Sequence, residues 1–210
     1  MKIPLILQLK RQNHKELAIA QDIMIENIFN IEDAVFHGGT AIWRCYGGNR
    51  FSEDIDLYLP NDKKVNEIFN SFEKNGLVPL KKKVTKKGVY SKFKYNRVIV
   101  RFEAVFKNID SILVDYNLVN GNSITIYSLS PESLIVEKTN AYLNRLKIRD
   151  LYDVFFLLKL VKEKNKLNFF LNKLIKNYKQ PVDENNLKTL IINGIIPSSK
   201  KMMEYVKKWV

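Results

Sequence analysis

The apolar residues of this chain change their spacing near residue 128, and this change limits the folds available to it. Before that point, short alternating runs typical of strands are mixed with helical segments. From Ser130 onward, where Pro131 favours a helix start, the spacing is helical throughout. We therefore predict an α+β protein, with a mixed α/β domain at residues 1–128 and a helical domain at residues 129–210.

The same patterns place the individual segments. Strands are expected at residues 34–36, 54–59, 77–84, 89–95, 98–106, 112–119 and 124–127. Helices are expected at residues 13–30, 40–46, 62–74, 131–144, 149–164, 167–178, 183–192 and 199–209. The prediction is a small mixed sheet flanked by helices, followed by helices alone.

Composition excludes several kinds of site. A single cysteine, Cys45, rules out an intrachain disulfide framework, and a total of two histidines rules out a His-rich metal site. No segment reaches the roughly 18 apolar residues that a membrane span needs. The first residues also lack the small-residue cleavage site of a secretory signal. We expect a cytoplasmic protein with no membrane partner.

The net charge of +13 has two explanations. An AT-rich genome enriches lysine and asparagine in any protein that it encodes. A surface that binds a polyanion such as RNA also requires many cations. Composition alone leaves both explanations open.

Two glycines mark the first chemically informative turn. Gly38 and Gly39 end a short apolar strand and precede a helix, so that backbone can approach a ligand closely. The N–H groups at such a helix start attract anions, and Thr40 adds a hydroxyl there. A Gly-Gly pair is also a common ordinary turn, so the turn needs support from its neighbours.

Paired carboxylates follow on the next strand. Asp54 and Asp56 are two residues apart, which places both side chains on one face of a strand. Such a pair repels unless a cation lies between its members, and Mg²⁺ prefers oxygen ligands and substrate phosphates. The pair taken alone fits a solvated edge strand equally well. Beside the glycine turn, it indicates metal-assisted phosphoryl or nucleotidyl transfer.

The order of these residues resembles motif I of the AbiEii/AbiGii abortive-infection nucleotidyltransferases. These are toxins of toxin–antitoxin pairs within the DNA polymerase β-like nucleotidyltransferase superfamily. The matching residues are Gly38, Gly39, Thr40, Ala41, Arg50, Ser52, Asp54, Ile55, Asp56 and Leu57. A second block, residues 130–157, is similar to the family's later motifs through Lys138, Arg145, Arg149, Asp150 and Asp153. The resemblance implies a polymerase-β-like fold for residues 1–128.

The resemblance also implies two Mg²⁺ ions held by Asp54, Asp56 and a third carboxylate on a neighbouring strand. The candidates are Asp115 and Glu103. Asp115 interrupts an otherwise apolar strand, where a carboxylate is costly unless it is paired or metal-bound. The family also has an acid in an apolar strand before its helical half. We choose Asp115, with Glu103 as the alternative and an exposed strand face as the ordinary explanation.

The remaining matched residues would handle the nucleoside triphosphate. In the family pattern, Lys138 supplies a cation to the triphosphate. Asp153 orients Lys138 or the attacking group, with Asp150 as the second candidate. The residues expected to bind nucleotide are Gly38, Gly39, Thr40, Arg50, Ser52 and Lys138. Read without the resemblance, Lys138 is a solvated helix lysine and the acids are ordinary helix-start residues.

The implied reaction moves a nucleoside monophosphate from an NTP to an acceptor. Because some family toxins extend tRNA 3′ ends, tRNA is the expected acceptor and an antitoxin the expected partner. The alternatives are nucleotidylation of a protein or small molecule, and a non-catalytic nucleotide- or RNA-binding module. Basic residues around the predicted hairpins are either an RNA track or solvated lysines: Lys81–Lys83, Lys86, Lys87, Lys92, Lys94, Arg97 and Arg101.

Overall fold

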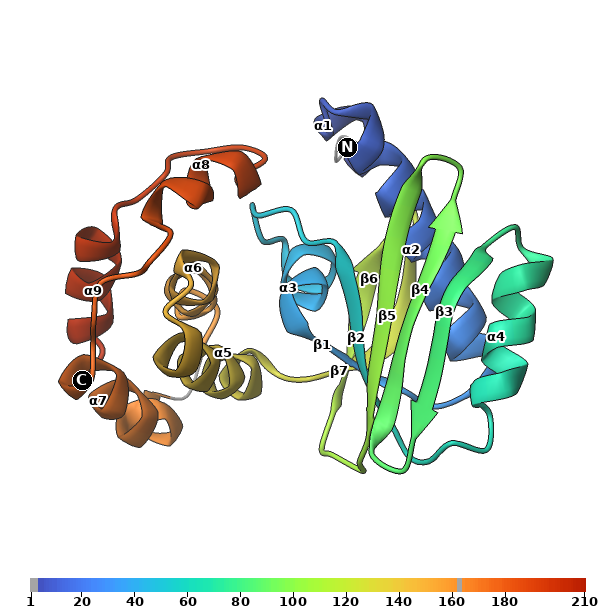
Figure 1. Ribbon diagram of the computed structural model, residues 1–210. Helices are drawn as coiled ribbons and strands as arrows, with labels where there is room; N and C mark the ends of the chain where they lie inside the picture. The colour runs from blue at the N-terminus through green and yellow to red at the C-terminus, as the bar shows by residue number, and fades with distance from the viewer. Residues whose placement is uncertain (1–3, 162–163) are drawn as a thin grey trace. The chain divides into compact units, whose positions relative to one another are not determined.

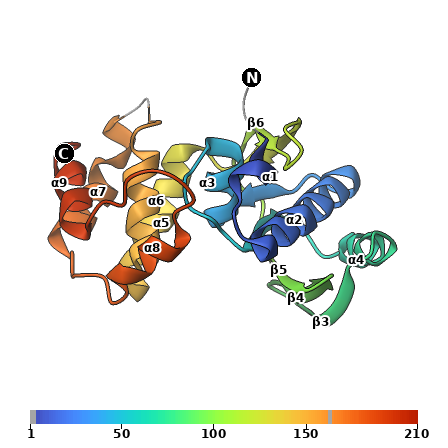
Figure 2. The same ribbon diagram turned by 90° about the horizontal axis from the view of Figure 1, so that it is seen from above.

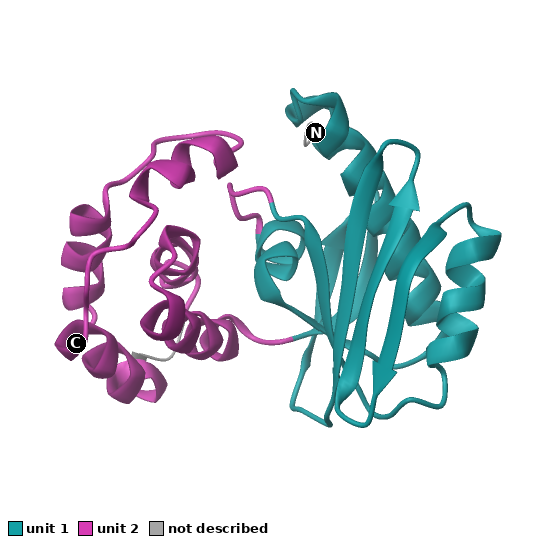
Figure 3. Ribbon diagram, viewed as in Figure 1, with its two compact units in different colours: residues 1–46, 52–128 teal, residues 47–51, 129–210 magenta. Residues whose placement is uncertain are grey.

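The computed structural model describes residues 4–161 and 164–210, which form two compact units (Figures 1 and 3). Unit 1 contains the described residues up to Tyr46 together with Ser52–Ser128. Unit 2 contains Leu129–Val210 and, in addition, Gly47–Phe51. The short segment Gly47–Phe51 was assigned to the first domain by sequence, but it folds with unit 2.

Unit 1 is built on a seven-stranded sheet with the order β3-β4-β5-β2-β1-β7-β6. The strands are β1 (Val35–His37), β2 (Asp54–Leu59), β3 (Val78–Thr85), β4 (Gly88–Tyr95), β5 (Val98–Phe106), β6 (Ile112–Asn117) and β7 (Ser123–Ser128). Two pairings, β2 with β5 and β1 with β7, are parallel, and the others are antiparallel. The prediction of a mixed sheet in an α/β arrangement is confirmed.

Helices cover one face of this sheet. The helices of unit 1 are α1 (Leu5–Gln8), α2 (Gln12–Ile31), α3 (Gly38–Tyr46) and α4 (Val65–Lys74). Figure 2 shows α2 and α4 on the same side of β3, β4 and β5. Ile55, Leu57 and Leu59 of β2 are buried in the core on that side, whereas the residues between them are half-buried. The alternation of β2 therefore turns its two aspartates away from the core.

Unit 2 is helical in its described part. Its α-helices are α5 (Pro131–Arg145), α6 (Ile148–Leu157), α7 (Asn168–Lys176), α8 (Leu187–Leu190) and α9 (Ser199–Lys207). The predicted helix at residues 149–164 is too long, because α6 ends at Leu157; residues 162–163 lie outside the described residues. The predicted helix at 183–192 is reduced to a 3₁₀ turn and the four residues of α8.

The segment Gly47–Phe51 pairs with the chain that follows α8. The Phe51 N–H donates to the Leu190 carbonyl at 2.8 Å, and the Ile192 N–H donates to the Asn49 carbonyl at 2.8 Å. Arg50 and Ile191 form an antiparallel bridge between these bonds. The segment Gly47–Phe51 is thus part of unit 2, and only Ser52 and Glu53 separate it from Asp54 at the start of β2.

Within the described residues, no helix is both long enough and apolar enough to cross a membrane.

Candidate active site

Asp54 and Asp56 lie on β2 beside β5, and the register between these strands brings a third acid to them. Asp54 is opposite Arg101, and Asp56 is opposite Glu103. All four side chains share the face of the sheet that turns away from the buried residues of β2 and β5. Three carboxylates and one guanidinium therefore lie on the same face of two adjacent strands of unit 1.

The glycine turn lies directly beside Asp56. Gly38 has φ +77°, a conformation that favours glycine, and a Cβ there would come within 2.9 Å of the Asp56 carboxyl carbon. His37, the residue before it, pairs across the sheet with Asp56. Asp56 thus requires the absence of a side chain at Gly38, which explains the glycine physically.

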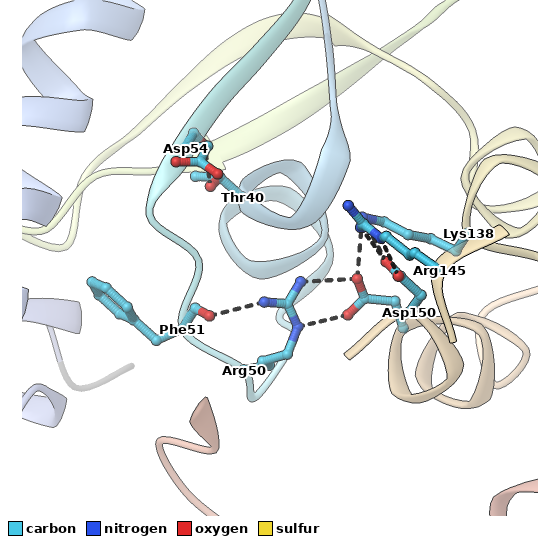
Figure 4. A network of polar contacts seen from close by, with 8 residues as sticks. Thr40, Arg50, Phe51, Asp54, Lys138, Arg145 and Asp150 are labelled. Carbon is cyan, nitrogen blue, oxygen red and sulfur yellow. Dashed lines mark hydrogen bonds and ion pairs between the residues drawn. The ribbon is translucent and has the colours of Figure 1, made fainter. Parts of the chain in front are cut away.

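Thr40 has a structural role in this turn. Its side chain is buried, and its hydroxyl donates to the main-chain carbonyl of Asp54 at 2.5 Å (Figure 4). The first turn of α3 is thereby tied to the start of β2. This hydrogen bond occupies the hydroxyl proton of Thr40 and leaves the expected role of its main-chain N–H unchanged.

Arg101 holds the carboxylate of Asp54 with two parallel bonds. Arg101 Nε donates to Asp54 Oδ1 at 2.6 Å, and an Nη donates to Asp54 Oδ2 at 2.9 Å. This is the bidentate geometry in which arginine binds carboxylates most strongly. Both oxygens of Asp54 are engaged by one cation of the same protein.

Glu103 lies among like charges. Partial burial, followed by the charges of Asp56 and Asp54, raises the pKa of Glu103 above its ordinary value, and Arg101 opposes the rise. A cation bound among these carboxylates would relieve their mutual repulsion.

The chemistry of this donor set suits Mg²⁺, which takes carboxylate oxygens and completes its shell with water and phosphate. The residues that would hold it are Asp54, Asp56 and Glu103. Among the residues that the structure describes, no three His, Cys, Asp or Glu side chains already converge into a metal-binding group. The carboxylate of Asp54 points toward Arg101, which explains physically why it does not converge with the other two acids.

Asp115, the preferred third carboxylate of the sequence analysis, lies elsewhere in the sheet. It is on the edge strand β6, separated from β2 by β7 and β1. Three strand spacings amount to roughly 14 Å. Its exposed side chain accepts a hydrogen bond from Thr125 at 3.2 Å, so the expected cost of a buried acid does not arise. The choice of Asp115 is therefore corrected in favour of Glu103.

The second block forms an ion-pair cluster inside unit 2 (Figure 4). Arg50 donates to both oxygens of Asp153 at 2.9 Å, and Lys138 Nζ lies 3.3 Å from Asp153 Oδ2. Arg145 donates to both oxygens of Asp150 at 2.7 Å, and Lys138 Nζ is 4.0 Å from Asp150 Oδ1. Three cations surround two carboxylates, which leaves one excess positive charge.

Asp153 is ionised despite its burial. Burial alone would raise the pKa of Asp153, but Arg50 and then Lys138 lower it below its ordinary value. The carboxylate therefore keeps its charge and can orient the Lys138 ammonium. Asp150 contacts the same lysine at the longer distance and is held mainly by Arg145.

Arg50 was expected among the nucleotide-binding residues, and its position calls for a correction. Its side chain is buried, its Nε and one Nη are committed to Asp153, and its other Nη donates to the Phe51 carbonyl at 3.0 Å. These bonds give Arg50 a structural role, because they tie the segment before β2 to Asp153 of α6. The main-chain carbonyl of Ser52, the next residue but one, accepts a bond from Gln21 at 2.9 Å.

Sequence reasoning undervalued Arg101 and Glu103. Arg101 appeared only as one of many hairpin cations, and Glu103 only as an alternative. Arg101 and Glu103 are two residues apart on one strand, as Asp54 and Asp56 are on another. This shared spacing is the signal in the sequence that could have linked the two pairs. Their meeting depends on which strands become neighbours, which no local pattern specifies.

Solved structures with the same fold include two bacterial proteins. MenT4, a nucleotidyltransferase toxin from Mycobacterium tuberculosis, superimposes with a TM-score of 0.68 at 17% identity, covering 96% of this chain and 85% of that chain. JHP933 from Helicobacter pylori superimposes with a TM-score of 0.67 at 21% identity, covering 95% of this chain and 92% of that chain. At these identities the likeness establishes the fold.

The family is established by a sequence profile. A search of curated proteins found no match. The profile of the nucleotidyl transferase AbiEii toxin family, type IV toxin–antitoxin system, matches residues 25–204. That range includes both the β2–β5 carboxylates and the cluster around Lys138. The chain is a nucleotidyltransferase that belongs to the AbiEii toxin family of type IV toxin–antitoxin systems.

Proposed function

We propose that this toxin uses Mg²⁺ to transfer a nucleoside monophosphate from an NTP to the 3′ end of a tRNA in the cytoplasm. Family membership implies an NTP substrate and an antitoxin partner. The observation that carries the metal-dependent part is the register of Asp54 and Asp56 with Glu103 on one face of the sheet. Two ions at these carboxylates would activate the acceptor hydroxyl and neutralise the leaving pyrophosphate.

The proposal gives the nucleotide two protein contacts. The main-chain N–H groups at the start of α3, from Gly38 to Thr40, would hold phosphate oxygens. Lys138 would add a cation, since the side chains named in its cluster carry an excess positive charge and its own side chain is 10% exposed. Asp153 orients that ammonium in the proposal, and Arg50 orients Asp153.

The support for an RNA acceptor is the open face, which we define as the side of β3, β4 and β5 continuous with Asp54 and Asp56. Cross-strand pairing aligns its side chains in rows. One row contains Lys81, Lys92, Arg101 and Asp54, and the next contains Lys83, Tyr90, Glu103 and Asp56. The lysines and Tyr90 are exposed. Cations leading to the carboxylates suit a phosphate backbone that ends at a reacting 3′ hydroxyl.

Lys82 does not belong to this surface. It is opposite Ser91, whose side chain is buried on the helix-covered face of the sheet. There it forms an ion pair with Glu73 of α4 and lies 5.2 Å from the centroid of the Phe69 ring. The RNA track proposed for Lys81–Lys83 as a group is therefore narrowed to the lysines of the open face.

The test of the metal-dependent reaction is incubation with total tRNA, each labelled NTP and Mg²⁺, followed by gel analysis. Asp56→Asn and Glu103→Gln should lower the rate at least about 100-fold, because several kcal/mol of metal-based stabilisation are lost. Asp115→Asn is the matched control and should stay within about twofold. Full activity of Glu103→Gln together with loss in Asp115→Asn would reverse the assignment.

The acceptor is tested on the open face. The double variant Lys81→Ala, Lys92→Ala should weaken tRNA binding and reduce its salt dependence by a slope of about 0.7 to 0.9 for each phosphate that is no longer neutralised. The control Lys86→Ala, Lys87→Ala removes the same charge at the exposed β3–β4 turn. Equal effects in both double variants would show that tRNA binding depends on the total positive charge and not on the open face. Labelling of a protein or small molecule instead of tRNA would favour the alternative acceptors.

A further inference from the structure

Resting on the proposed function, we infer that Arg101 is an internal counter-ion that a divalent metal must displace from Asp54. Arg101 then determines how much metal the enzyme needs. This role differs from that of the metal ligands, because Arg101 itself is not a ligand. Arg101 occupies the place of the metal before the metal binds.

The geometry places Arg101 and a metal ion in competition for the carboxylate of Asp54. Arg101 Nε and Nη each bind a different oxygen of Asp54, at 2.6 and 2.9 Å. A Mg²⁺ ligand must direct an oxygen lone pair at the ion within about 2.1 Å. A guanidinium lying across both oxygens stands where such an ion would approach, and its positive charge repels the ion.

Charge balance gives the same result. Asp54, Asp56 and Glu103 carry three negative charges when ionised, and Arg101 neutralises one of them. One divalent ion neutralises more of this charge than one guanidinium does, so exchange of Arg101 for the metal is favourable once metal is abundant.

The pair is also accessible enough to exchange. The side chain of Arg101 is 45% exposed and that of Asp54 is 24% exposed. Water can replace the guanidinium contacts during exchange, so opening this exposed pair costs less than opening a buried one. A released Arg101 remains on the open face between Lys92 and Asp54, where it can contact a phosphate.

A different role for Arg101 predicts the opposite result. If Arg101 held Asp54 in the orientation that the metal requires, its removal would weaken metal binding. The counter-ion role predicts tighter binding when Arg101 is removed. The sign of the change in metal affinity therefore separates the two roles without any activity measurement.

The experiment measures Mn²⁺, as a spectroscopic substitute for Mg²⁺, by electron paramagnetic resonance of the free ion in the absence of NTP. Arg101→Ala should bind Mn²⁺ roughly two- to fivefold more tightly than the wild type, the upper part of the range expected for the loss of one exposed ion pair. Arg101→Lys keeps the charge but loses the bidentate fork, so its affinity should fall between the two.

The matched control is Arg97→Ala, which removes an exposed arginine from the same hairpin at the β4–β5 turn. It should change Mn²⁺ affinity less than twofold. Unchanged or weaker binding by Arg101→Ala, or an equal gain in Arg97→Ala, would overturn the inference while the metal site stands. Wild-type Mn²⁺ binding that survives Asp54→Asn, Asp56→Asn and Glu103→Gln would remove the metal site itself, and the inference with it.

Discussion

Two arginine–aspartate pairs, one in each unit, have nearly the same geometry and very different surroundings. In unit 1, Arg101 binds both oxygens of Asp54, and the two side chains are 45% and 24% exposed. In unit 2, Arg50 binds both oxygens of Asp153, and the side chains are 5% and 1% exposed. The same pair of residue types is thus exchangeable in one place and permanent in the other.

The difference comes from solvation. In water, each partner of the exposed pair regains hydration when the pair opens, so opening costs little. In the buried pair, removal of one partner leaves a charge without water or counter-ion, which costs much more. The residue types and hydrogen bonds alone therefore do not tell which of the two pairs opens more easily.

The largest expected effect is the loss of the buried pair. Arg50→Ala should lower the free energy of unfolding by about 3–5 kcal/mol, because it leaves the Asp153 carboxylate buried without its bidentate partner. Urea unfolding followed by circular dichroism measures it. Arg149→Ala, at the start of α6, is the control and should change the value by less than about 0.5 kcal/mol. If Arg50→Ala lowered the free energy of unfolding by less than about 1 kcal/mol, the buried pair would not differ from the exposed one.

Acid should weaken the same pair. Because Arg50 and Lys138 lower the pKa of Asp153 below its unfolded value of about 3.9, its contribution to stability is complete above that pH. The contribution is lost as the pH falls through the lower folded pKa. Asp153→Asn should therefore be less stable than wild type at pH 7, with a gap that shrinks below about pH 4. A gap that is constant from pH 7 to about pH 2.5 would show that ionisation of Asp153 adds nothing.

The excess charge of the buried cluster should act on the nucleotide. Lys138→Met should weaken NTP binding by roughly 1.5–3 kcal/mol, the value of a charge-assisted bond to phosphate, or about one to two powers of ten. Titration of a fluorescent NTP measures the affinity. Lys188→Met removes an exposed lysine of α8 and should leave the affinity unchanged. If both variants bind alike, Lys138 does not contact the triphosphate.

The smallest effect is expected from the exposed pair. Arg101→Ala should lower the free energy of unfolding of the metal-free protein by less than about 1 kcal/mol. The loss should shrink further at about 1 M salt, where the screening length is near 3 Å. Unfolding at low and high salt measures both. A loss as large as that of Arg50→Ala, insensitive to salt, would remove the distinction between the two pairs.

Most helices and strands could be predicted from local sequence patterns. The alternation of residues 54–59 predicted β2 with the right ends and placed Asp54 and Asp56 on one face. The run of residues 98–106 likewise predicted β5. The helix predicted at 149–164 was too long, because apolar spacing continues beyond Leu157 although α6 ends there. Periodicity identifies an element more reliably than it identifies the end of that element.

The residues that contact each site residue could not be predicted in the same way. Asp115 satisfied every local criterion for a buried strand acid, yet its strand forms the edge of the sheet and its side chain is exposed. Arg50 matched a motif for nucleotide binding, yet its guanidinium is committed to an aspartate 103 positions away. Local sequence describes the residue itself, whereas strand order and long-range packing decide what lies beside it.

The sequence by itself determined the family, the strand that carries Asp54 and Asp56, and the glycine turn between a short strand and a helix. These features depend on a few neighbouring residues and on the two-residue period of a strand. Only the tertiary structure decided that Glu103 rather than Asp115 joins the pair and that Arg101 holds Asp54 while Arg50 is buried against Asp153. The reason is that pairing and burial depend on contacts between distant segments, and those contacts also decide the energy of each charge.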